Sequence, residues 1–388
     1  MGAGAAWIGA IWLVTRFAAL LGMLAAKHGD LGAVLGVAAA NTYDASWYRA
    51  IAVHGYADPH LGGPVTVFYP GYPLVIAALY WPVRLVGDLL AGAGQFAPVA
   101  NGIVLPGAML LISNLALLGA LLVLWRLYEP RFGSRATILG TGFLLAAPTS
   151  FFLSAGYSES LFVLVVAASF LNAERGRWLQ VSLLGAAACL IRFPGFLLII
   201  PLAMIWATKP RRAPRWPALG GLGIFAIGAL AYPAWLWAVS GDVLAYLHLQ
   251  ETHHRGLSGP WTAVGAMIDQ ARNAVRVLRG HPSNQRLNDV PTIAANSLAL
   301  VVGIATAIVG WARLHAYEVV WVILVFLVPL LTGTGESLDR YWLAAFPIFF
   351  LIGWWLRRWP IVAAGLMTLS TVWLVVLSYN FARIIWVG

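Results

Sequence analysis

A succession of long apolar segments, separated by short charged loops, constrains the fold of this chain more than any other feature. Because a bilayer core has no water to satisfy backbone polar groups, a chain that crosses it repeatedly does so as α-helices. Several segments are shorter than the about 20 residues of a straight span, which predicts helices that are tilted, extended by neighbouring residues, or broken. The chain is therefore predicted to be an all-α, polytopic integral membrane protein with spans near residues 6–26, 106–127, 136–153, 159–173, 179–191, 195–208, 217–238, 292–312, 317–333, 341–356 and 360–380.

The composition agrees with this interpretation and excludes other classes of protein. Hydrophobic residues make up 61% of the chain and charged residues 10%. Soluble domains carry about 25% charged residues, so a soluble enzyme and a disordered chain are excluded. A scaffold of intrachain disulfides is excluded because Cys189 is the sole cysteine. The net charge of +10 does not predict a nucleic-acid partner, because the basic residues lie in short loops and not on one water-facing surface.

The segment 68–90 decides the predicted sidedness, because it is long and apolar but contains three prolines and two charged residues. If it does not span, 12 basic and three acidic residues fall on one side, and 11 of each fall on the other. The positive-inside rule favours this arrangement, with 11 spans and a cytoplasmic N-terminus. If it does span, the basic loops at 126–135, 175–177 and 209–215 share a side with Asp44.

Two long stretches are predicted outside the membrane, within a single membrane domain over residues 1–388. They are 27–105, with juxtamembrane helices, and 239–291. Eleven of the 14 acidic residues, and every histidine except His315, lie on this extracytoplasmic side in the favoured arrangement. Long loops are usually functional, so the chemistry is expected there.

The most informative part of the first stretch is residues 41–56. Asn41 is a good helix N-cap and Gly55 a good helix stop, which predicts a short helix between them. Helical spacing places Asp44, Trp47 and Tyr48 on one face. A carboxylate on an apolar, aromatic face is a candidate general base. Alternatively, Asp44 only stabilises the N-terminus of this helix.

Four segments, in order along the chain, form a recognisable pattern. The first is Tyr-Asp-Ala-Ser-Trp-Tyr at 43–48 with Phe-Tyr-Pro-Gly-Tyr-Pro at 68–73, and the second is Pro-Thr-Ser-Phe-Phe at 148–152 with Tyr-Ser-Glu-Ser-Leu-Phe at 157–162. The third and fourth are Ser-Gly-Asp-Val-Leu-Ala-Tyr-Leu-His at 240–248, and Arg-Tyr at 340–341 before Phe-Pro at 346–347. Together they resemble the PIG-V-like mannosyltransferases, integral membrane glycosyltransferases of the GT-C superfamily. Tyr43 stands where that family usually has tryptophan, and Val243 where it has proline.

The resemblance implies a GT-C-like helical bundle and an inverting mannosyltransferase. Its donor is a polyprenyl-phosphate-mannose, and its acceptor is a lipid-linked glycan, a glycolipid or a protein. The site faces the extracytoplasmic side of a plasma membrane, which is bacterial if the excess of 22 arginines over two lysines reflects a GC-rich genome. By position, Asp44 is the general base and Glu159 a second catalytic residue that orients the acceptor or the base. The substrate contacts implied are Tyr43, Trp47, Tyr48, Tyr69, Tyr157, Asp242, His248 and Tyr341.

Three arginines and Glu159 also have interpretations that rest on charge alone. Arg192 and Arg340 fall at extracytoplasmic ends of predicted spans, where a planar guanidinium suits a leaving lipid phosphate. Alternatively, each is a paired or interfacial arginine. Glu159 could equally stabilise the first turn of its helix. Arg16, in the middle of the first span, requires a partner or a water-filled cavity.

Most of the notable residues in the second long stretch, 239–291, are explained by structural roles close to them in the sequence. Asp242 is a good N-cap for an amphipathic stretch that reaches His254. Glu251, His253 and His254 lack the spacing of a known metal site, so no metal is predicted and a divalent cation is not indicated. In 255–291, apolar residues and arginines alternate at helical spacing, which predicts an interfacial helix with a basic face on membrane lipid.

Two other functions fit the same composition. A transporter or flippase for lipid-linked sugars would also need many spans, an intramembrane arginine and a cavity. No inverted repeat of helices interrupted by Gly or Pro is evident, which counts against it. A non-catalytic assembly partner of another membrane enzyme is the third candidate. It would be favoured if Asp44 and Glu159 could both be replaced without loss.

Overall fold

The computed structural model describes residues 2–39, 42–56, 65–208, 215–252 and 256–387, and this part of the chain is helical throughout, without a β-strand. Six of its helices are long and apolar enough to cross a membrane. The predicted all-α, multi-pass character is thereby confirmed. The six helical stretches are Gly4–Ala26, Gly71–Ala91, Ala97–Phe132, Gly221–Ser240, Leu287–Ala312 and Pro360–Ala382.

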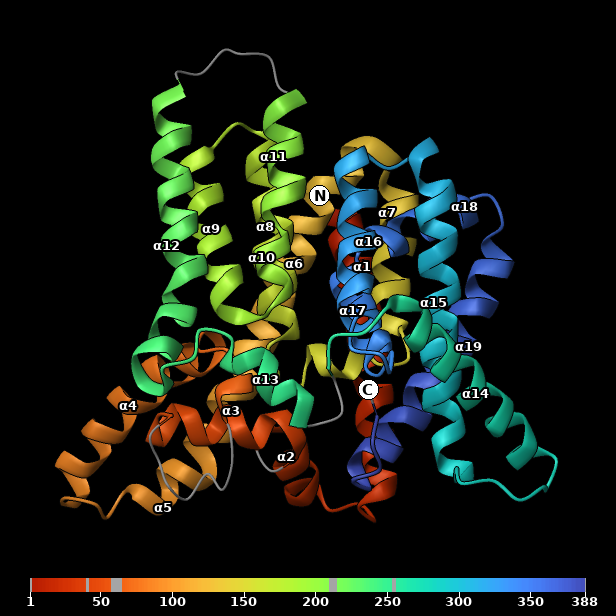
Figure 1. Cartoon of the computed structure of the whole chain (residues 1–388). Coiled ribbons are helices and arrows are strands. Elements are labelled where there is room, and N and C mark those ends of the chain that lie inside the picture. The colour runs from red at the N-terminus through yellow and green to blue at the C-terminus, as the bar shows by residue number, and fades with distance from the viewer. Residues whose placement is uncertain (1, 40–41, 57–64, 209–214, 253–255, 388) are drawn as a thin grey trace.

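Most helices run along one common axis, upright in Figure 1. The other helices gather at the lower end of the molecule in that view, and we call the two ends of the bundle the lower and the upper end. The upright helices are α1 (Gly2–Ala26), α6 (Leu105–Phe132), α7 (Ser134–Ala146), α8 (Glu159–Glu174), α9 (Trp178–Ile191), α10 (Pro194–Leu197), α11 (Ile199–Thr208), α12 (Arg215–Ser240), α15 (Val290–Val309), α16 (Ala316–Leu330), α18 (Pro347–Leu356) and α19 (Pro360–Ala382). At or near the lower end lie α2 (Leu31–Ala39), α3 (Tyr43–His54), α4 (Gly71–Ala91), α5 (Ala97–Val99), α13 (Ala245–Thr252), α14 (Pro260–Leu278) and α17 (Leu338–Ala344).

The upright helices form two groups that meet along α6, α7, α11 and α16. In one group α9 packs between α12 and α8, and α8 packs on α6. In the other, α7 packs on α18 and α1 on α19, while α6 contacts α7 and α11 contacts α16. Small residues allow the closest approaches, as is usual between membrane helices. A Cβ added to Gly353 of α18 would lie 2.4 Å from the carbonyl oxygen of Ala136 in α7.

Two of the predicted apolar spans are broken in the structure. The run 195–208 is divided into α10 and α11 at Leu198, and the run 341–356 begins within α17 and continues as α18. Pro347 is the first residue of α18, and the helix breaks at Ala345, with φ of −84° and ψ of 42°. Proline has no N–H with which to continue the hydrogen bonding of α17. Helix breaks such as these occur at membrane depth where the freed backbone groups are buried in protein.

Arg16, whose partner the sequence left open, is held by backbone carbonyls. Its Nη1 donates to the carbonyl oxygen of Ser150 at 2.6 Å, and its Nη2 donates to that of Leu145 at 2.6 Å and to Ser150 Oγ at 2.8 Å. These acceptors lie where α7 ends and a short 3-10 helix, η4 (Ser150–Leu153), follows. The last carbonyls of a helix have no intrahelical donor, so the guanidinium stabilises a helix end inside the bundle.

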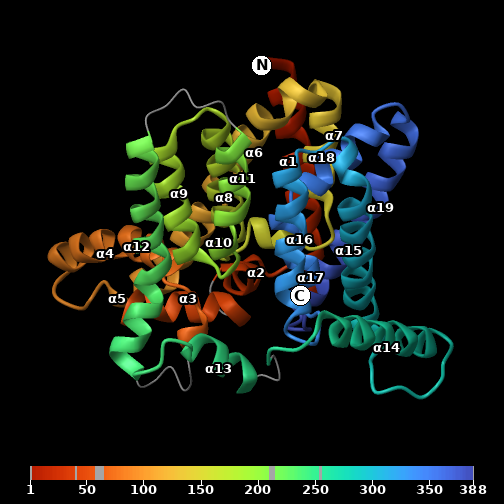
Figure 2. The same ribbon diagram turned by 45° about the horizontal axis from the view of Figure 1, so that its top comes forward.

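The segment 68–90, predicted to lie outside the membrane, contains helix α4. By length and composition α4 could cross a bilayer. In both views, however, it points sideways from the bundle at the lower end and does not follow the common axis (Figures 1 and 2). Large apolar side chains project from it, and Leu90 is 84% exposed. α4 therefore lies across the common axis and presents an apolar surface away from the bundle.

The interfacial helix predicted within 255–291 is α14. It carries an exposed apolar row at helical spacing, formed by Trp261, Ile268, Val275 and Leu278. Arg272, four residues after Ile268, lies beside this row and pairs with Asp269 at 3.1 Å. Like α4, this helix lies across the common axis (Figure 2), as expected for an amphipathic helix in a membrane interface.

Candidate active site

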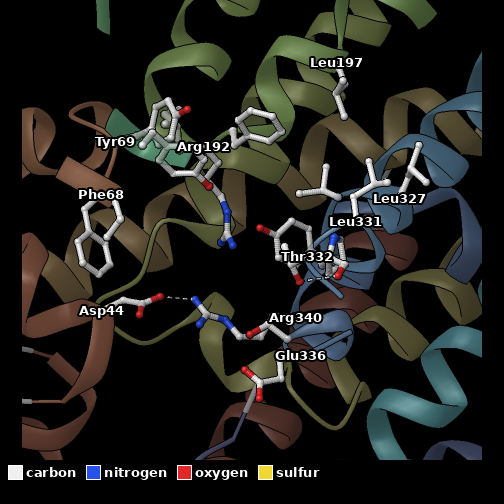
Figure 3. A pocket seen from close by; sticks show the side chains of 18 of the residues that line it. Asp44, Phe68, Tyr69, Arg192, Leu197, Leu327, Leu331, Thr332, Glu336 and Arg340 are labelled. Carbon is white, nitrogen blue, oxygen red and sulfur yellow. Dashed lines mark hydrogen bonds and ion pairs between the residues drawn. The ribbon is translucent and has the colours of Figure 1, made fainter. Parts of the chain in front are cut away.

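A cavity of about 910 Å³ opens between the two helix groups at the lower end of the bundle (Figure 3). We call it the ionic cavity, because four charged side chains form its polar wall or the layer behind that wall. Residues of α3, the segment 67–69, the α9–α10 connection, α13, α16 and α17 line it. Eight residues that the sequence predicted for the site are among them: Tyr43, Asp44, Trp47, Tyr48, Tyr69, Arg192, Arg340 and Tyr341.

Asp44, Glu159, Arg192 and Arg340 form one connected ion cluster. Arg340 Nη2 lies 2.8 Å from Asp44 Oδ2 and 2.5 Å from Glu159 Oε1, and Arg340 Nε donates to the same Glu159 oxygen at 3.0 Å. Arg192 Nη1 lies 2.6 Å from Glu159 Oε1. Two guanidinium groups and two carboxylates thus converge from four separate parts of the chain, and their formal charges cancel.

The four side chains differ in their access to the cavity. Those of Glu159 and Arg340 are 3% and 6% exposed, whereas those of Asp44 and Arg192 are 23% and 16% exposed. Figure 3 shows Arg192 reaching into the cavity opposite Asp44 and Arg340. Glu159 is therefore a buried anchor that holds both arginines. Asp44 and Arg192 present the polar groups that a ligand would meet.

Asp44 is positioned by α3, and the predicted helix is confirmed there. Gly55 ends it in a left-handed conformation, with φ of 71°, and donates its N–H to the carbonyl oxygen of Ile51. The predicted cap, Asn41, lies outside the described residues. Thr42 stands at the cap position but makes no side-chain capping bond, because its Oγ1 donates instead to the carbonyl oxygen of Val37 at 2.7 Å. Asp44, in the first turn, accepts a hydrogen bond from Arg340 and is therefore more than a helix-terminal charge.

Glu159 is the first residue of α8, as the sequence predicted for a loop turning into a span. Its Oε1 receives all three arginine hydrogen bonds, and its buried Oε2 has no hydrogen-bond partner in the described part of the chain. Tyr157, just before it, is fully buried and is not in the cavity lining. Its ring centroid lies 5.2 Å from the Arg340 guanidinium, and that of Phe152 lies 4.5 Å from it. Tyr157 therefore supports Arg340 from behind.

Aromatic side chains surround the cavity mouth. Trp47 stacks on Phe68 with ring centroids 6.0 Å apart, and Tyr48 meets the same ring edge-on at 5.5 Å. The Tyr48 hydroxyl also lies 3.1 Å from Ser158 Oγ, which fixes α3 against the residue before α8. These contacts hold the helix that carries Asp44, and a planar aromatic wall suits the apolar face of a sugar ring.

One wall of the cavity is apolar and is formed mainly by α16. Leu324, Leu327, Val328 and Leu331 line it, with Leu197 of α10 nearby. Figure 3 places Leu197, Leu327 and Leu331 on the side of the cavity away from Asp44. The cavity is thus polarised, with ionic groups at one side and aliphatic side chains at the other.

Asp242 and His248 lie outside the ionic cavity and pair with each other. His248 Nδ1 is 2.7 Å from Asp242 Oδ2, and both side chains are exposed, by 57% and 38%. This hydrogen bond raises the pKa of His248 and lowers the pKa of Asp242. Asp242 Oδ1 accepts the N–H of Leu244, so it stabilises the turn before α13 rather than capping the helix itself. The structure does not bring these two residues to the other predicted site residues.

Several lining residues were missed by the sequence reasoning. Trp386 contacts Tyr43 edge-on, with ring centroids 5.2 Å apart, and Tyr246 contacts Tyr69 at 5.3 Å. Glu336 lines the cavity from the turn before α17. Its position four residues before Arg340 was the available signal. No signal in the sequence distinguishes Trp386, because aromatic residues are frequent throughout the chain.

Asp339, next to Arg340, was also not predicted as a site residue. It is fully buried, and neither of its carboxylate oxygens has a hydrogen-bond partner among the described residues. Its backbone is fixed on both sides, because its N–H donates to Asn296 Oδ1 at 3.0 Å and its carbonyl oxygen accepts from Thr149 Oγ1. These bonds to α15 and to the residue before η4 hold the first turn of α17, and with it Arg340.

In the described ranges no group of three His, Cys, Asp or Glu side chains is arranged to hold a metal ion. Comparison with known proteins gives no assignment: no protein-family model and no curated protein matches the chain. The chemistry of the ionic cavity must therefore be argued from its own residues and from the four segments that resemble the PIG-V-like enzymes.

Proposed function

We propose that this chain is an inverting GT-C-type glycosyltransferase. It moves mannose from a polyprenyl-phosphate-mannose donor to a lipid-linked glycan, a glycolipid or a protein. The observation that carries the proposal is the convergence of Asp44, Arg192 and Arg340 on one cavity. A carboxylate that can accept a proton there faces guanidiniums that can bind a phosphate, beside an aliphatic wall.

Asp44 acts as the general base in this mechanism. The acceptor hydroxyl attacks the anomeric carbon, its proton passes to Asp44, and the bond from the anomeric carbon to the phosphate oxygen breaks with its electrons leaving on polyprenyl phosphate. Asp44 Oδ2 is held by Arg340, while Oδ1 makes no hydrogen bond to a described residue. The bond from Arg340 thus orients the carboxylate and leaves one oxygen for the acceptor.

Arg192 binds the leaving phosphate. Its contact with Glu159 uses Nη1, and a guanidinium has five N–H donors in a planar fork. Tyr341 stacks on it, with the guanidinium carbon 5.3 Å from the ring centroid. Glu159 is a positioning residue that holds Arg192 and Arg340 on one carboxylate oxygen and offsets the repulsion between their charges. The aliphatic residues of α16 suit the first isoprene units of the donor lipid.

The orientation is part of the same proposal. The spans are α1, α6, α7, α8, α9, α10 with α11, α12, α15, α16, α17 with α18, and α19, while α4 and α14 lie in the interface. The C-terminal end of α6, the α8–α9 turn and the α18–α19 turn, all rich in arginine, lie at the upper end (Figure 1). By the positive-inside rule this end and the N-terminus are cytoplasmic. The ionic cavity then faces the extracytoplasmic side of a bacterial plasma membrane.

The decisive experiment is transfer by the purified protein in lipid, with radiolabelled polyprenyl-phosphate-mannose and a panel of glycolipid and peptide acceptors. We expect wild type to transfer the sugar and Asp44→Asn to lose about 10²- to 10⁴-fold in rate, as for removal of a general base. The variant should keep its thermal stability and its binding of donor. Movement of donor across vesicles without transfer would favour the transporter, and full turnover by Asp44→Asn would remove this residue from the mechanism.

The orientation is tested by cysteine labelling with a membrane-impermeant maleimide. Cys189 is fully buried, so the background is low. We expect Ala93→Cys, after α4, to label in spheroplasts, and Arg358→Cys, after α18, to label only after permeabilisation. Asp30→Cys, just before α2, should label from the same side as Ala93→Cys, and labelling of these two from opposite sides would overturn the arrangement in which α4 does not span.

A further inference from the structure

A second cavity, of about 740 Å³, lies at the upper end of the bundle, away from the ionic cavity. We call it the arginine pocket. Arg126 near the end of α6, Arg135 in the first turn of α7 and Arg175 after α8 contribute its charge. It is lined in addition by Gly4, Trp7, Trp125, Glu129, Pro130, Ser134 and Ile138.

The three arginines of the pocket are exposed and have no partner among the described residues. No described residue forms an ion pair or a hydrogen bond with their guanidinium groups. Glu129, the carboxylate in the lining, accepts a hydrogen bond from Ser134 Oγ at 2.9 Å instead. With one carboxylate and three guanidiniums the pocket carries a formal charge of about +2. By contrast Arg131, one turn away, is fully engaged by Glu318.

The first turn of α7 adds further donors for an anion. Ser134 and Arg135 are the first two residues of this helix and both line the pocket. The N–H groups of a first turn have no acceptor within their own helix and attract anions. Gly133, before them, has a φ of 77° and brings the chain sharply from α6 into α7. The pocket thus combines arginine forks with backbone donors, the usual composition of a phosphate site.

The remaining wall of the pocket is aromatic. Trp7 of α1 is 63% exposed beside it, and Trp125 of α6 packs on Gly4 so closely that a Cβ there would lie 2.4 Å from the indole. Exposed tryptophans at the ends of membrane helices lie at the level of lipid headgroups. We propose that the arginine pocket binds a phosphate-bearing anion, as the headgroup of an anionic phospholipid or as free phosphate. Basic pockets between membrane helices bind such headgroups.

The test is native mass spectrometry of the full-length protein with phosphatidylglycerol, phosphatidylcholine or inorganic phosphate added separately. We expect one phosphate-bearing anion to bind in preference to phosphatidylcholine. Arg126→Gln/Arg175→Gln should weaken this binding at least tenfold, equivalent to about 1.4 kcal/mol. The matched control, Arg177→Gln/Arg358→Gln, removes the same charge from exposed positions outside the pocket lining and should change it less than twofold.

Further comparisons distinguish a lipid headgroup from free phosphate as the ligand and define the results that would overturn the proposal. If phosphatidylglycerol binds and Trp7→Ala weakens this binding, the ligand is a lipid headgroup. If inorganic phosphate binds as tightly as phosphatidylglycerol and Trp7→Ala has no effect on binding, the ligand is free phosphate. Equal losses in the two double variants, or equal binding of phosphatidylcholine, would overturn the proposal. Because all four arginines lack partners in the described chain, unchanged thermal unfolding is expected for both double variants. Arg135→Gln serves as an independent pocket variant.

Discussion

Among the described residues, two clusters of arginine and carboxylate side chains join distant helices, and one of these two borders a cavity. At the upper end Arg131 of α6 meets Glu318 of α16 through two parallel hydrogen bonds of 3.0 and 2.8 Å. Glu318 is fully buried, and its Oε2 also accepts the N–H of His315. At the lower end the cluster of Asp44, Glu159, Arg192 and Arg340 leaves Asp44 and Arg192 partly exposed to the ionic cavity.

The difference between the clusters lies in how their hydrogen-bonding capacity is used. In the Arg131–Glu318 pair both carboxylate oxygens are engaged, and Tyr128 and Phe132 lie under the guanidinium at 5.7 and 5.1 Å. In the lower cluster Glu159 Oε1 takes three bonds and Asp44 uses one oxygen. A closed pair can only hold helices together. An open cluster with free donors and acceptors can also bind and orient a ligand.

The largest effect on stability is expected from breaking the closed pair. Arg131→Ala leaves the buried Glu318 carboxylate uncompensated, which costs about 3–5 kcal/mol when a buried pair loses one partner. Thermal unfolding in detergent, followed by tryptophan fluorescence, should show a large decrease in midpoint, while transfer per folded molecule is retained. Arg313→Ala is the control, because this exposed arginine only stacks on Trp354. A loss of transfer that exceeds the loss of folded protein would show that the two ends are coupled.

A smaller effect, on binding rather than folding, is expected from the open cluster. Arg192→Ala removes a phosphate donor that is partly exposed, and Glu159 keeps Arg340 as a partner. The affinity for the donor lipid should fall about tenfold, equivalent to about 1.4 kcal/mol. Equilibrium binding of labelled polyprenyl-phosphate-mannose measures it, with Arg177→Ala as the exposed control. Unchanged donor affinity together with a large loss of stability would make Arg192 a structural arginine like Arg131.

The smallest effect is expected from the Asp242–His248 pair outside the cavity. The pKa of His248 is raised by Asp242, so the stabilisation is fully present below the unfolded value of about 6.5 and is lost as pH rises through the folded pKa. NMR titration of labelled histidine should place the His248 midpoint above that of the Asp242→Asn variant. His248→Ala should change transfer less than twofold at any pH from 6 to 8. A tenfold loss would instead bring this pair into the reaction.

The sequence predicted the elements of the fold better than their contacts. The lengths of the apolar runs predicted the long helices, and the helical spacing within 43–54 followed by Gly55 predicted α3. Both signals lie within the segment that they predict. Broken helices were one of three alternatives for the short spans, but the positions of the breaks within 195–208 and 341–356 were not predicted, since a buried broken helix has the same composition as a continuous one. That 68–90 does not span follows from charge balance, a property of the whole chain, and stays a prediction.

In the candidate site, too, the sequence predicted single residues but not the contacts between residues far apart in the chain. Resemblance to known segments selected Asp44, Glu159 and Arg340 one by one, but Asp44 and Arg340 are 296 positions apart, and no spacing rule connects them. The Arg131–Glu318 pair, 187 positions apart, was counted only as loop charge. Asp242 and His248 carried a segment resemblance, yet their neighbours in space are each other.

The attachment of Arg16 has a consequence for the order in which the protein is assembled. The carbonyls that hold its guanidinium belong to residues 129 and 134 positions further along the chain. During synthesis α1 therefore emerges with a charge that has no partner until α7 and η4 have been made. On insertion scales a charge at the centre of a membrane helix costs about 2.5–3.5 kcal/mol. The helix group formed by α1, α7 and α19 therefore closes only when the chain returns to α1.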